Sequence, residues 1–300
     1  MQGMSMAWWL AGPPLIIAAA AFWGLSGGLS GLLIEHGWAP LLVAFCRGLI
    51  GGALILGWWL LAPGRYRRPD WRMLAASAIA GVGVAGNLGF YCISIAHTSV
   101  AVAATLLYTA PLYVYLAALV MRTERLRWPR LLALALIILG VVLLTRVFQV
   151  DPAKLSWLGI LAGLGGGLSY AVFIFGFGQA TRYGRPPSVL AIAFAVFVVV
   201  LLPLIDIGRA GAALGSADVG LFVALGLAGG GLSFPLYVAG LRDTSPVLAS
   251  VVAMMEPVTA ALFGVGVLGN TLAPLQLVGM ALIIGIVTLL SVQRARSQQA

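Results

Sequence analysis

The amino-acid sequence predicts an all-α polytopic membrane protein. Its ten transmembrane helices are expected to form two inverted five-helix repeats, with the N- and C-termini cytoplasmic. The apolar composition, a set of motifs that occurs twice and the placement of the charges support this prediction. Hydrophobic residues make up 62% of the 300 residues and charged residues only 8%, whereas soluble domains carry roughly 25% charge. With a mean hydropathy of +1.07, the chain is too apolar for a soluble domain.

Ten apolar runs are long enough to cross the hydrocarbon layer, which takes roughly 20 helical residues. They are expected at 13–34, 40–62, 73–95, 100–121, 131–148, 157–178, 188–205, 219–240, 246–267 and 274–292. No basic segment and cleavage site flank the first run, so we interpret it as a retained span.

The second half of the chain repeats the first. Tyr91, Thr98, Ser99 and Pro111 reappear 146 positions later as Tyr237, Thr244, Ser245 and Pro257. Each copy would contain five spans, and an odd number of spans places the second copy upside down in the bilayer. We therefore divide the chain into repeats at 1–150 and 151–300, an arrangement typical of secondary transporters.

The charges agree with this topology, because Lys and Arg accumulate in short cytoplasmic loops. With the N-terminus inside, the inner loops and tail carry thirteen arginines and three acidic residues, and the outer loops carry three basic and four acidic residues. The net charge of +9 therefore reflects loops on one side of the lipid bilayer, and no nucleic-acid partner is expected.

The sequence contains no motif for catalysis or cofactor binding. The phosphate loop GxxxxGK[ST] and the motifs HExxH and GxSxG do not occur. Cys46 and Cys92 fall inside predicted spans, and His36 and His97 lie in predicted outer loops. We therefore expect no catalytic residue, no metal site and no cofactor.

Two prolines point to a site at the membrane midplane. Pro111 and Pro257 each lie eleven residues into a predicted span, and proline removes a backbone donor and kinks a helix. Interrupted helices at matching positions of two inverted halves indicate a midplane substrate site, so we interpret both prolines as hinges; kinks in lipid-facing helices are the alternative. Pro235 predicts a third kink.

Polar and aromatic side chains cluster near these prolines in the sequence. Asn87 and Tyr91 share a helix face, as do Ser233 and Tyr237 in the second half. Aromatic rings with few charges suit a substrate that has a flat apolar part and a small polar head; packing is the alternative for each ring taken singly. The predicted substrate-binding residues are Trp23, Ser26, Asn87, Tyr91, Tyr108, Tyr113, Tyr170, Phe173, Ser233, Tyr237 and Glu256.

Arg47 and Glu256 are the two charged residues that cannot be assigned to a loop, and both fall well inside predicted spans. A charge there costs at least about 2 to 3 kcal/mol on insertion scales and is a functional hypothesis by default. Glu256 could receive a substrate ammonium, carry a coupling proton or accept backbone hydrogen bonds. Arg47 could bind a carboxylate, or snorkel or pair with a helix end.

Glycines recur four residues apart within several predicted spans. The pairs are Gly27 with Gly31, Gly48 with Gly52, Gly159 with Gly163, Gly163 with Gly167, and Gly226 with Gly230. This GxxxG spacing is typical of helices that pack closely in a membrane; surfaces that slide during transport are the alternative.

Several segments resemble the two EamA repeats of the drug/metabolite transporter superfamily. They are WG at 23–24, FCRGL at 45–49, APLYVYLAALVMRTERL at 110–126, and MEPVTAALFGVGVLGN at 255–270. The resemblance implies that helices 1 to 4 and 6 to 9 surround a central cavity, with helices 5 and 10 outside. Within the superfamily the chain looks most like bacterial aromatic amino acid exporters of the YddG kind. Asn270 and Ala110 depart from this pattern, because Glu is often found at those positions.

These observations predict a multi-pass exporter of small amphipathic metabolites, aromatic and other amino acids among them, in the bacterial inner membrane. It would work by alternating access around a midplane cavity. A broad exporter of drugs or cationic compounds is the alternative within the superfamily. An intramembrane enzyme acting on lipids and a passive channel are the alternatives outside it.

The topology can be tested by thiol labelling. Cysteines placed near Arg67, Arg125 and Arg185 should react with a membrane-impermeant reagent only from the cytoplasmic side, because arginine-rich loops stay inside. Cysteines placed near His36 and Asp218 should react only from the opposite side. Labelling of either set from the wrong side would contradict the inverted arrangement.

Overall fold

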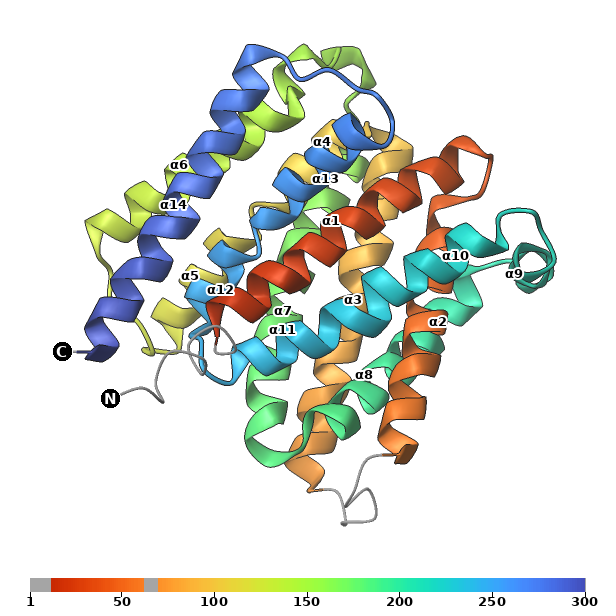
Figure 1. The fold of residues 1–300 in the computed structure, drawn as a ribbon, viewed down its shortest axis with the longest axis horizontal. Coiled ribbons are helices and arrows are strands. Elements are labelled where there is room, and N and C mark those ends of the chain that lie inside the picture. Colours follow the sequence, from red (N-terminus) through yellow and green to blue (C-terminus); the bar gives the residue numbers. More distant parts are fainter. Residues whose placement is uncertain (1–11, 62–69, 300) are drawn as a thin grey trace.

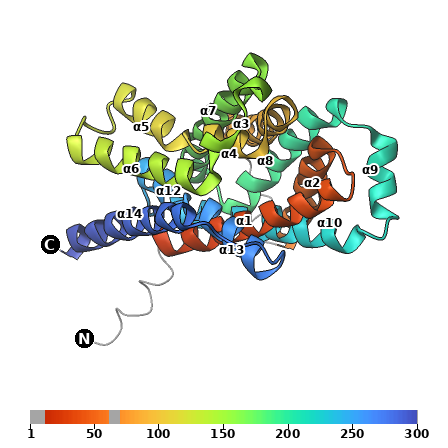
Figure 2. The same ribbon diagram turned by 90° about the horizontal axis from the view of Figure 1, so that it is seen from above.

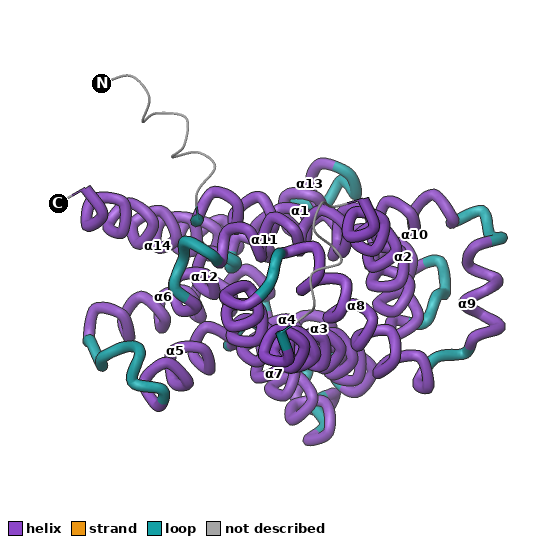
Figure 3. The backbone as a smooth tube through the Cα atoms, turned by 90° about the horizontal axis from the view of Figure 1, so that it is seen from below, coloured by secondary structure: helices purple, strands orange, loops and turns teal. Residues whose placement is uncertain are grey.

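The computed structural model describes residues 12–61 and 70–299, so the loop around Arg67 lies outside the described residues. Helices joined by short connections make up this part of the chain, and Figure 3 shows no strand in it. Ten spans are long and apolar enough to cross a membrane. The prediction of an all-α protein with ten spans is therefore confirmed, whereas the inverted repeat and the cytoplasmic termini stay predictions.

Seven of the spans are continuous helices. They are α1 (Pro13–Glu35), α2 (Pro40–Leu61), α3 (Trp71–His97), α6 (Trp128–Thr145), α7 (Trp157–Tyr183), α8 (Pro186–Leu201, extended by a 3₁₀ turn to Leu204) and α14 (Pro274–Gln299). A short helix that the sequence analysis treated as loop, α9 (Ile207–Leu214), lies outside the spans. In Figure 2 it stands at one edge of the molecule, at the far end from α6.

The other three spans are interrupted. The fourth consists of α4 (Val100–Leu107) and α5 (Ala110–Val120), and the ninth of α12 (Pro246–Val252) and α13 (Met255–Gly266). The eighth contains α10 (Val219–Gly226), the π-helical segment η4 (Leu227–Leu232) and α11 (Ser233–Leu241). The expected kinks in the fourth and ninth spans are therefore complete breaks.

The fourth and ninth spans have matching sequence signals, a serine at the start of each span and a proline just after its break. Both spans begin at a serine N-cap: the side chain of Ser99 accepts the N–H of Val102, and that of Ser245 accepts the N–H of Leu248. Such caps satisfy an N–H that has no partner inside the helix. Pro111 and Pro257 each lie in the first turn after the break, where the missing proline N–H costs no helical hydrogen bond.

Glycine brings α3 and α7 into backbone contact. A Cβ atom on Gly83 would lie 2.6 Å from the backbone nitrogen of Phe173, and one on Gly176 would lie 2.8 Å from that of Ala80. Small residues permit such an approach, which drives helix association in lipid. This pair of helices forms the framework against which the residues of the candidate site are placed.

The spans α6 and α14 pack side by side, away from most of the other helices (Figures 1 and 2). This agrees with the resemblance, which implies that the fifth and tenth helices lie outside the cavity. The separation is not complete, however, because Leu144 and Thr145 of α6 and Gln276 of α14 reach the cavity wall.

A contact between distant residues joins the α1–α2 turn to the start of α10. The carboxylate of Asp218 lies 2.7 Å from Nδ1 of His36 and accepts a hydrogen bond of 2.8 Å from Nε1 of Trp38. The hydrogen bond from Trp38 and that with His36 lower the pKa of Asp218 from its ordinary value. The carboxylate that contacts His36 thus lies 182 positions away in the sequence.

The contact between α3 and α7 can be tested with two alanines on α7. Gly176→Ala should destabilise the protein by roughly 1–3 kcal/mol, because the added Cβ would overlap the backbone at Ala80. Gly178→Ala is the matched control, since a Cβ there meets nothing within 4 Å. Thermal unfolding of the two variants in detergent measures the difference, and equal melting temperatures would contradict this packing.

Candidate functional site

A cavity of about 800 Å³ runs from the broken ninth span towards the turn between α1 and α2. Its wall includes the end of α1, the beginnings of α2 and α4, and the segment 268–272. We call this side of the molecule the α1–α2 face. The opposite side, where α1 begins and α14 ends (Figure 1), is the terminal face.

The two charged residues expected deep inside the spans line this cavity. Arg47 on α2 and Glu256 on α13 are half-buried there, and their opposite charges attract one another. Among the described residues they form no direct ion pair, and the Nε–H of Arg47 instead donates to the carbonyl oxygen of Gly229 at 3.0 Å. A positive and a negative group are thus presented to the same cavity.

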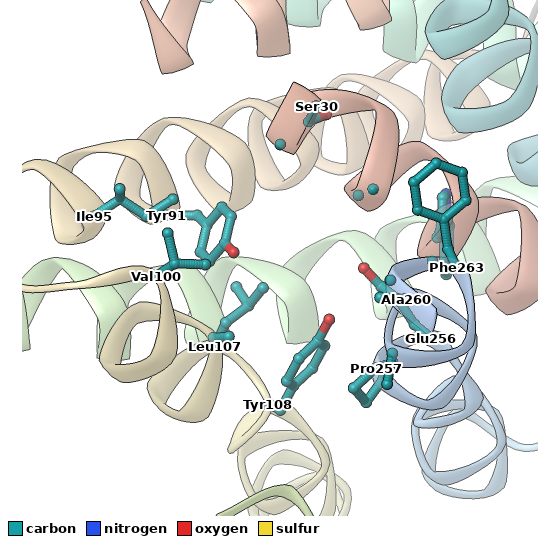
Figure 4. A pocket seen from close by; sticks show the side chains of 18 of the residues that line it. Ser30, Tyr91, Ile95, Val100, Leu107, Tyr108, Glu256, Pro257, Ala260 and Phe263 are labelled. Atoms are coloured by element: carbon teal, nitrogen blue, oxygen red, sulfur yellow. The ribbon is translucent and has the colours of Figure 1, made fainter. Parts of the chain in front are cut away.

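Hydroxyl and amide groups line the same cavity as the two charges. Tyr91 of α3 and Tyr108, which follows α4, project with Glu256 into the cavity (Figure 4). Asn87, one turn before Tyr91, uses its side-chain N–H₂ to donate to the carbonyl oxygen of Gly166 at 3.1 Å. The wall is therefore amphipathic, and Asn87 also connects α3 to α7.

Glycines of α1 shape the wall beside Glu256. A Cβ on Gly24 would lie 2.5 Å from the carbonyl oxygen of Glu256, so glycine allows α1 to approach α13 at this point. Gly27 and Gly31 face open space inside the cavity. The prediction that this pair makes a close helix contact is wrong, because its missing side chains widen the cavity instead.

An aromatic plug closes the cavity towards the terminal face. We give this name to seven buried residues: Trp23, Tyr170, Phe173, Phe177, Phe194, Phe234 and Tyr237. The ring centroids of Trp23 lie 5.2 Å from those of Phe234 and 4.9 Å from those of Tyr237. Because the plug is at most 4% exposed, the cavity opens on one side only.

Polar atoms of the plug and its neighbour Ser233 are buried without partners. Nε1 of Trp23, the hydroxyls of Tyr170 and Tyr237, and Oγ of Ser233 make no hydrogen bond with any described residue. Each such group costs roughly 1–3 kcal/mol. Such atoms need partners that the described residues do not supply, and water, a bound molecule or another conformation would provide them.

The structure brings together most, but not all, of the residues predicted to bind substrate. The cavity wall contains Trp23, Asn87, Tyr91, Tyr108, Tyr170, Phe173 and Glu256, and also the predicted hinge Pro257. Ser26, Tyr113, Ser233, Tyr237 and the hinge Pro111 lie outside it. Ser26 is fully buried and donates to the carbonyl oxygen of Trp23, and Tyr113 packs half-buried on α5 against the core.

Positions 146 residues apart lie in opposite environments. Tyr91 lines the cavity whereas Tyr237 is fully buried in the plug, and Asn87 lines the cavity whereas Ser233 is fully buried. For a third pair the residue of the second half borders the cavity: Glu256 lines it, whereas Ala110 of the first half is fully buried. In each pair, therefore, one residue borders the cavity and the other is buried in the protein.

Some lining residues were not among those predicted from the sequence. Asn270, Thr145 and Gln276 line the cavity near the α1–α2 face. Asn270 was recognised only as a departure from the family pattern, and the other two lie on the spans expected to be outside. Polar residues near the ends of spans show no helical periodicity, so the sequence does not distinguish those that line a cavity from those that lie in a loop.

Comparison with known proteins agrees with this geometry. The model of the EamA-like transporter family matches the chain twice, over residues 10–146 and 157–292. The chain belongs to the EamA-like transporter family. Family membership and the ten spans together make it a multi-pass membrane protein with a transporter role.

Similar EamA-like proteins occur in archaea and bacteria. An uncharacterised transporter of Archaeoglobus fulgidus is 31% identical over 261 residues, which cover 87% of this chain and 90% of that protein. The inner membrane transporter YedA of Escherichia coli K12 is 28% identical, with 92% and 89% covered. The threonine/homoserine exporter RhtA of the same organism is 27% identical, with 90% and 88% covered.

A solved crystal structure has the same fold. It covers 94% of this chain and 96% of its own with a TM-score of 0.72, at 19% sequence identity. At this identity the likeness concerns the fold alone.

The contrast between paired positions can be measured with single cysteines in a variant that lacks Cys46 and Cys92. In the conformation described here, Tyr91→Cys should react with a small hydrophilic thiol reagent, because position 91 is half-buried and borders the cavity. Tyr237→Cys should resist it, because position 237 is fully buried. Equal reaction rates for the two variants would show that the cavity does not open on one side only.

Proposed function

We propose that this EamA-like transporter exports small amphipathic amino acids, aromatic ones among them, by alternating access around its cavity. The observation that supports this most strongly is that Arg47 and Glu256 line the same cavity but are not bound to each other in an ion pair. An α-amino acid carries a carboxylate and an ammonium on the same carbon atom. The two side chains have the charges that would bind these groups.

The chemistry of each contact fits this substrate class. A guanidinium presents parallel N–H donors that match the two oxygens of a carboxylate, and a buried carboxylate can receive an ammonium. The rings of Trp23, Tyr170 and Phe173 at the base of the cavity would receive an apolar side chain. The name of RhtA, a threonine/homoserine exporter, indicates that a relative carries amino acids.

The alternatives explain the cavity less well. A cationic drug would bind next to Glu256, but Arg47 in the same cavity would repel it. A lipid-acting enzyme would need a reactive constellation, whereas the family and the relatives are described as transporters. Amino-acid export accounts for both charges at once.

Alternating access would exchange the open and closed sides of the cavity. The arginine-rich loops support a cytoplasmic terminal face, and the cavity described here would then open outward. In the other state the aromatic plug would separate and its unpartnered polar atoms would reach water or substrate. Pro111 and Pro257 would act as hinges, since both lie directly after breaks in their spans.

The two family matches support two repeats divided near residue 150. The inner membrane transporter among the relatives supports the bacterial inner membrane as the location.

Counterflow of labelled phenylalanine and threonine into liposomes that contain only this protein tests the proposal. The wild type should exchange both amino acids. Glu256→Gln should reduce exchange by about tenfold or more, because a charge-assisted hydrogen bond is lost while the shape is kept. Glu35→Gln is the matched control, since Glu35 also borders the cavity but is exposed at its mouth.

The outcomes separate the possible roles of Glu256. Loss of both counterflow and proton-driven transport supports substrate binding, whereas loss of proton-driven transport alone assigns Glu256 to proton coupling. Amino-acid exchange absent from the wild type, with exchange of organic cations present, would overturn the proposal in favour of a cation exporter.

A further inference from the structure

The π-helical segment η4 leaves one backbone carbonyl free to bind a side chain. In an α-helix the N–H of Ser233 would donate to the carbonyl oxygen of Gly229, four residues before it. Here the N–H of Ser233 donates to Ala228 instead, five residues before it. The carbonyl oxygen of Gly229 accepts the Nε–H of Arg47 at 3.0 Å. The π-helical segment therefore supplies the hydrogen-bond acceptor that the side chain of Arg47 uses.

The sequence explains why the helix is irregular at this place. Pro235 has no N–H to donate to a carbonyl in the preceding turn, so the regular ladder cannot pass through it. Gly229, Gly230 and Gly231 precede it and give the backbone freedom to change its hydrogen-bond pattern. Single π turns inside α-helices occur frequently at functional sites.

No side chain fits at Gly229. A Cβ atom there would overlap Nε of Arg47 and would lie 2.7 Å from Cβ of the fully buried Ser26. Glycine thus lets the backbone of η4 approach both α1 and α2. This approach brings the carbonyl within hydrogen-bond distance of the guanidinium.

The bond to Gly229 uses only one of the donors of Arg47. The Nη atoms have no hydrogen-bond partner among the described residues, and Arg47 lines the cavity. A guanidinium fixed through Nε keeps its Nη donors in one orientation, which reduces the entropy lost when an anionic group binds.

We propose that η4 is a positioning element for Arg47 and that Gly229 thereby sets the preference of the cavity for ligands with a carboxylate. This inference rests on the proposed function, because it takes the amino-acid carboxylate as the ligand of Arg47. Gly229 does not touch the substrate and acts through the side chain of Arg47.

Calorimetric titration of the purified protein with phenylalanine and with its decarboxylated amine, phenethylamine, tests the proposal. Gly229→Ala should weaken phenylalanine binding by about tenfold or more, the loss expected for a displaced charge-assisted hydrogen bond. Binding of the amine should change little, because it has no carboxylate for Arg47. Gly231→Ala is the matched control, since the one close contact of its Cβ would be with the end of the flexible Leu54 side chain, and its other neighbours lie at ordinary van der Waals distances.

A double-mutant cycle separates positioning from general damage to the fold. In an Arg47→Ala background, Gly229→Ala should have no further effect on phenylalanine binding, because residues that act as a unit are not additive. Additive losses, or equal losses for phenylalanine and the amine, would overturn the positioning role.

A chemical readout keeps this test independent of the substrate. Phenylglyoxal modifies arginine, and peptide mapping by mass spectrometry gives its rate at Arg47. Gly229→Ala should change that rate and Gly231→Ala should not, even if the wild type binds no amino acid and the proposed function fails. An unchanged rate in Gly229→Ala would show that the carbonyl does not hold Arg47.

Discussion

The need to pair every backbone polar group inside the bilayer governs this structure. Seven spans meet it as continuous helices, whereas the fourth, eighth and ninth do not. Irregular backbone at membrane depth is tolerated only inside the protein or along a polar cavity. Residues beside the breaks, Leu107, Tyr108 and Glu256, line the cavity, and the carbonyl freed in η4 is bound by Arg47. The site therefore lies where the helices are interrupted.

The spans and two of the three interruptions were predictable because they depend on local chemistry. Apolar runs of about 20 residues define the spans, and Pro111 and Pro257 mark the breaks in two of them. The π segment was not predictable in detail. Pro235 predicted a kink in the eighth span. Whether the helix kinks or forms a π turn there depends on Arg47, whose N–H needs a hydrogen-bond acceptor and which lies 182 positions from Gly229 in the sequence.

The charged residues within the spans predicted the site more accurately than the aromatic residues did. Glu256 and Arg47 were identified because any charge in a span requires a partner or a polar cavity. Tyr237 and Ser233 were predicted to bind substrate together with Tyr91 and Asn87, yet they lie in or beside the aromatic plug. Under the proposed alternating access one sequence serves more than one conformation, so the sequence would identify residues of the pathway but not which of them are open in a given state.

The two halves of the chain do not carry the same charges at positions 146 residues apart. Pro257 follows Glu256, whereas Pro111 follows the fully buried Ala110. A second carboxylate at position 110 would lie among core side chains in the conformation described here, at a large desolvation cost. Arg47 has no basic counterpart either, since Ala193 stands 146 positions later. The halves thus share breaks at matching positions, while each contributes one charge of opposite sign to the common cavity.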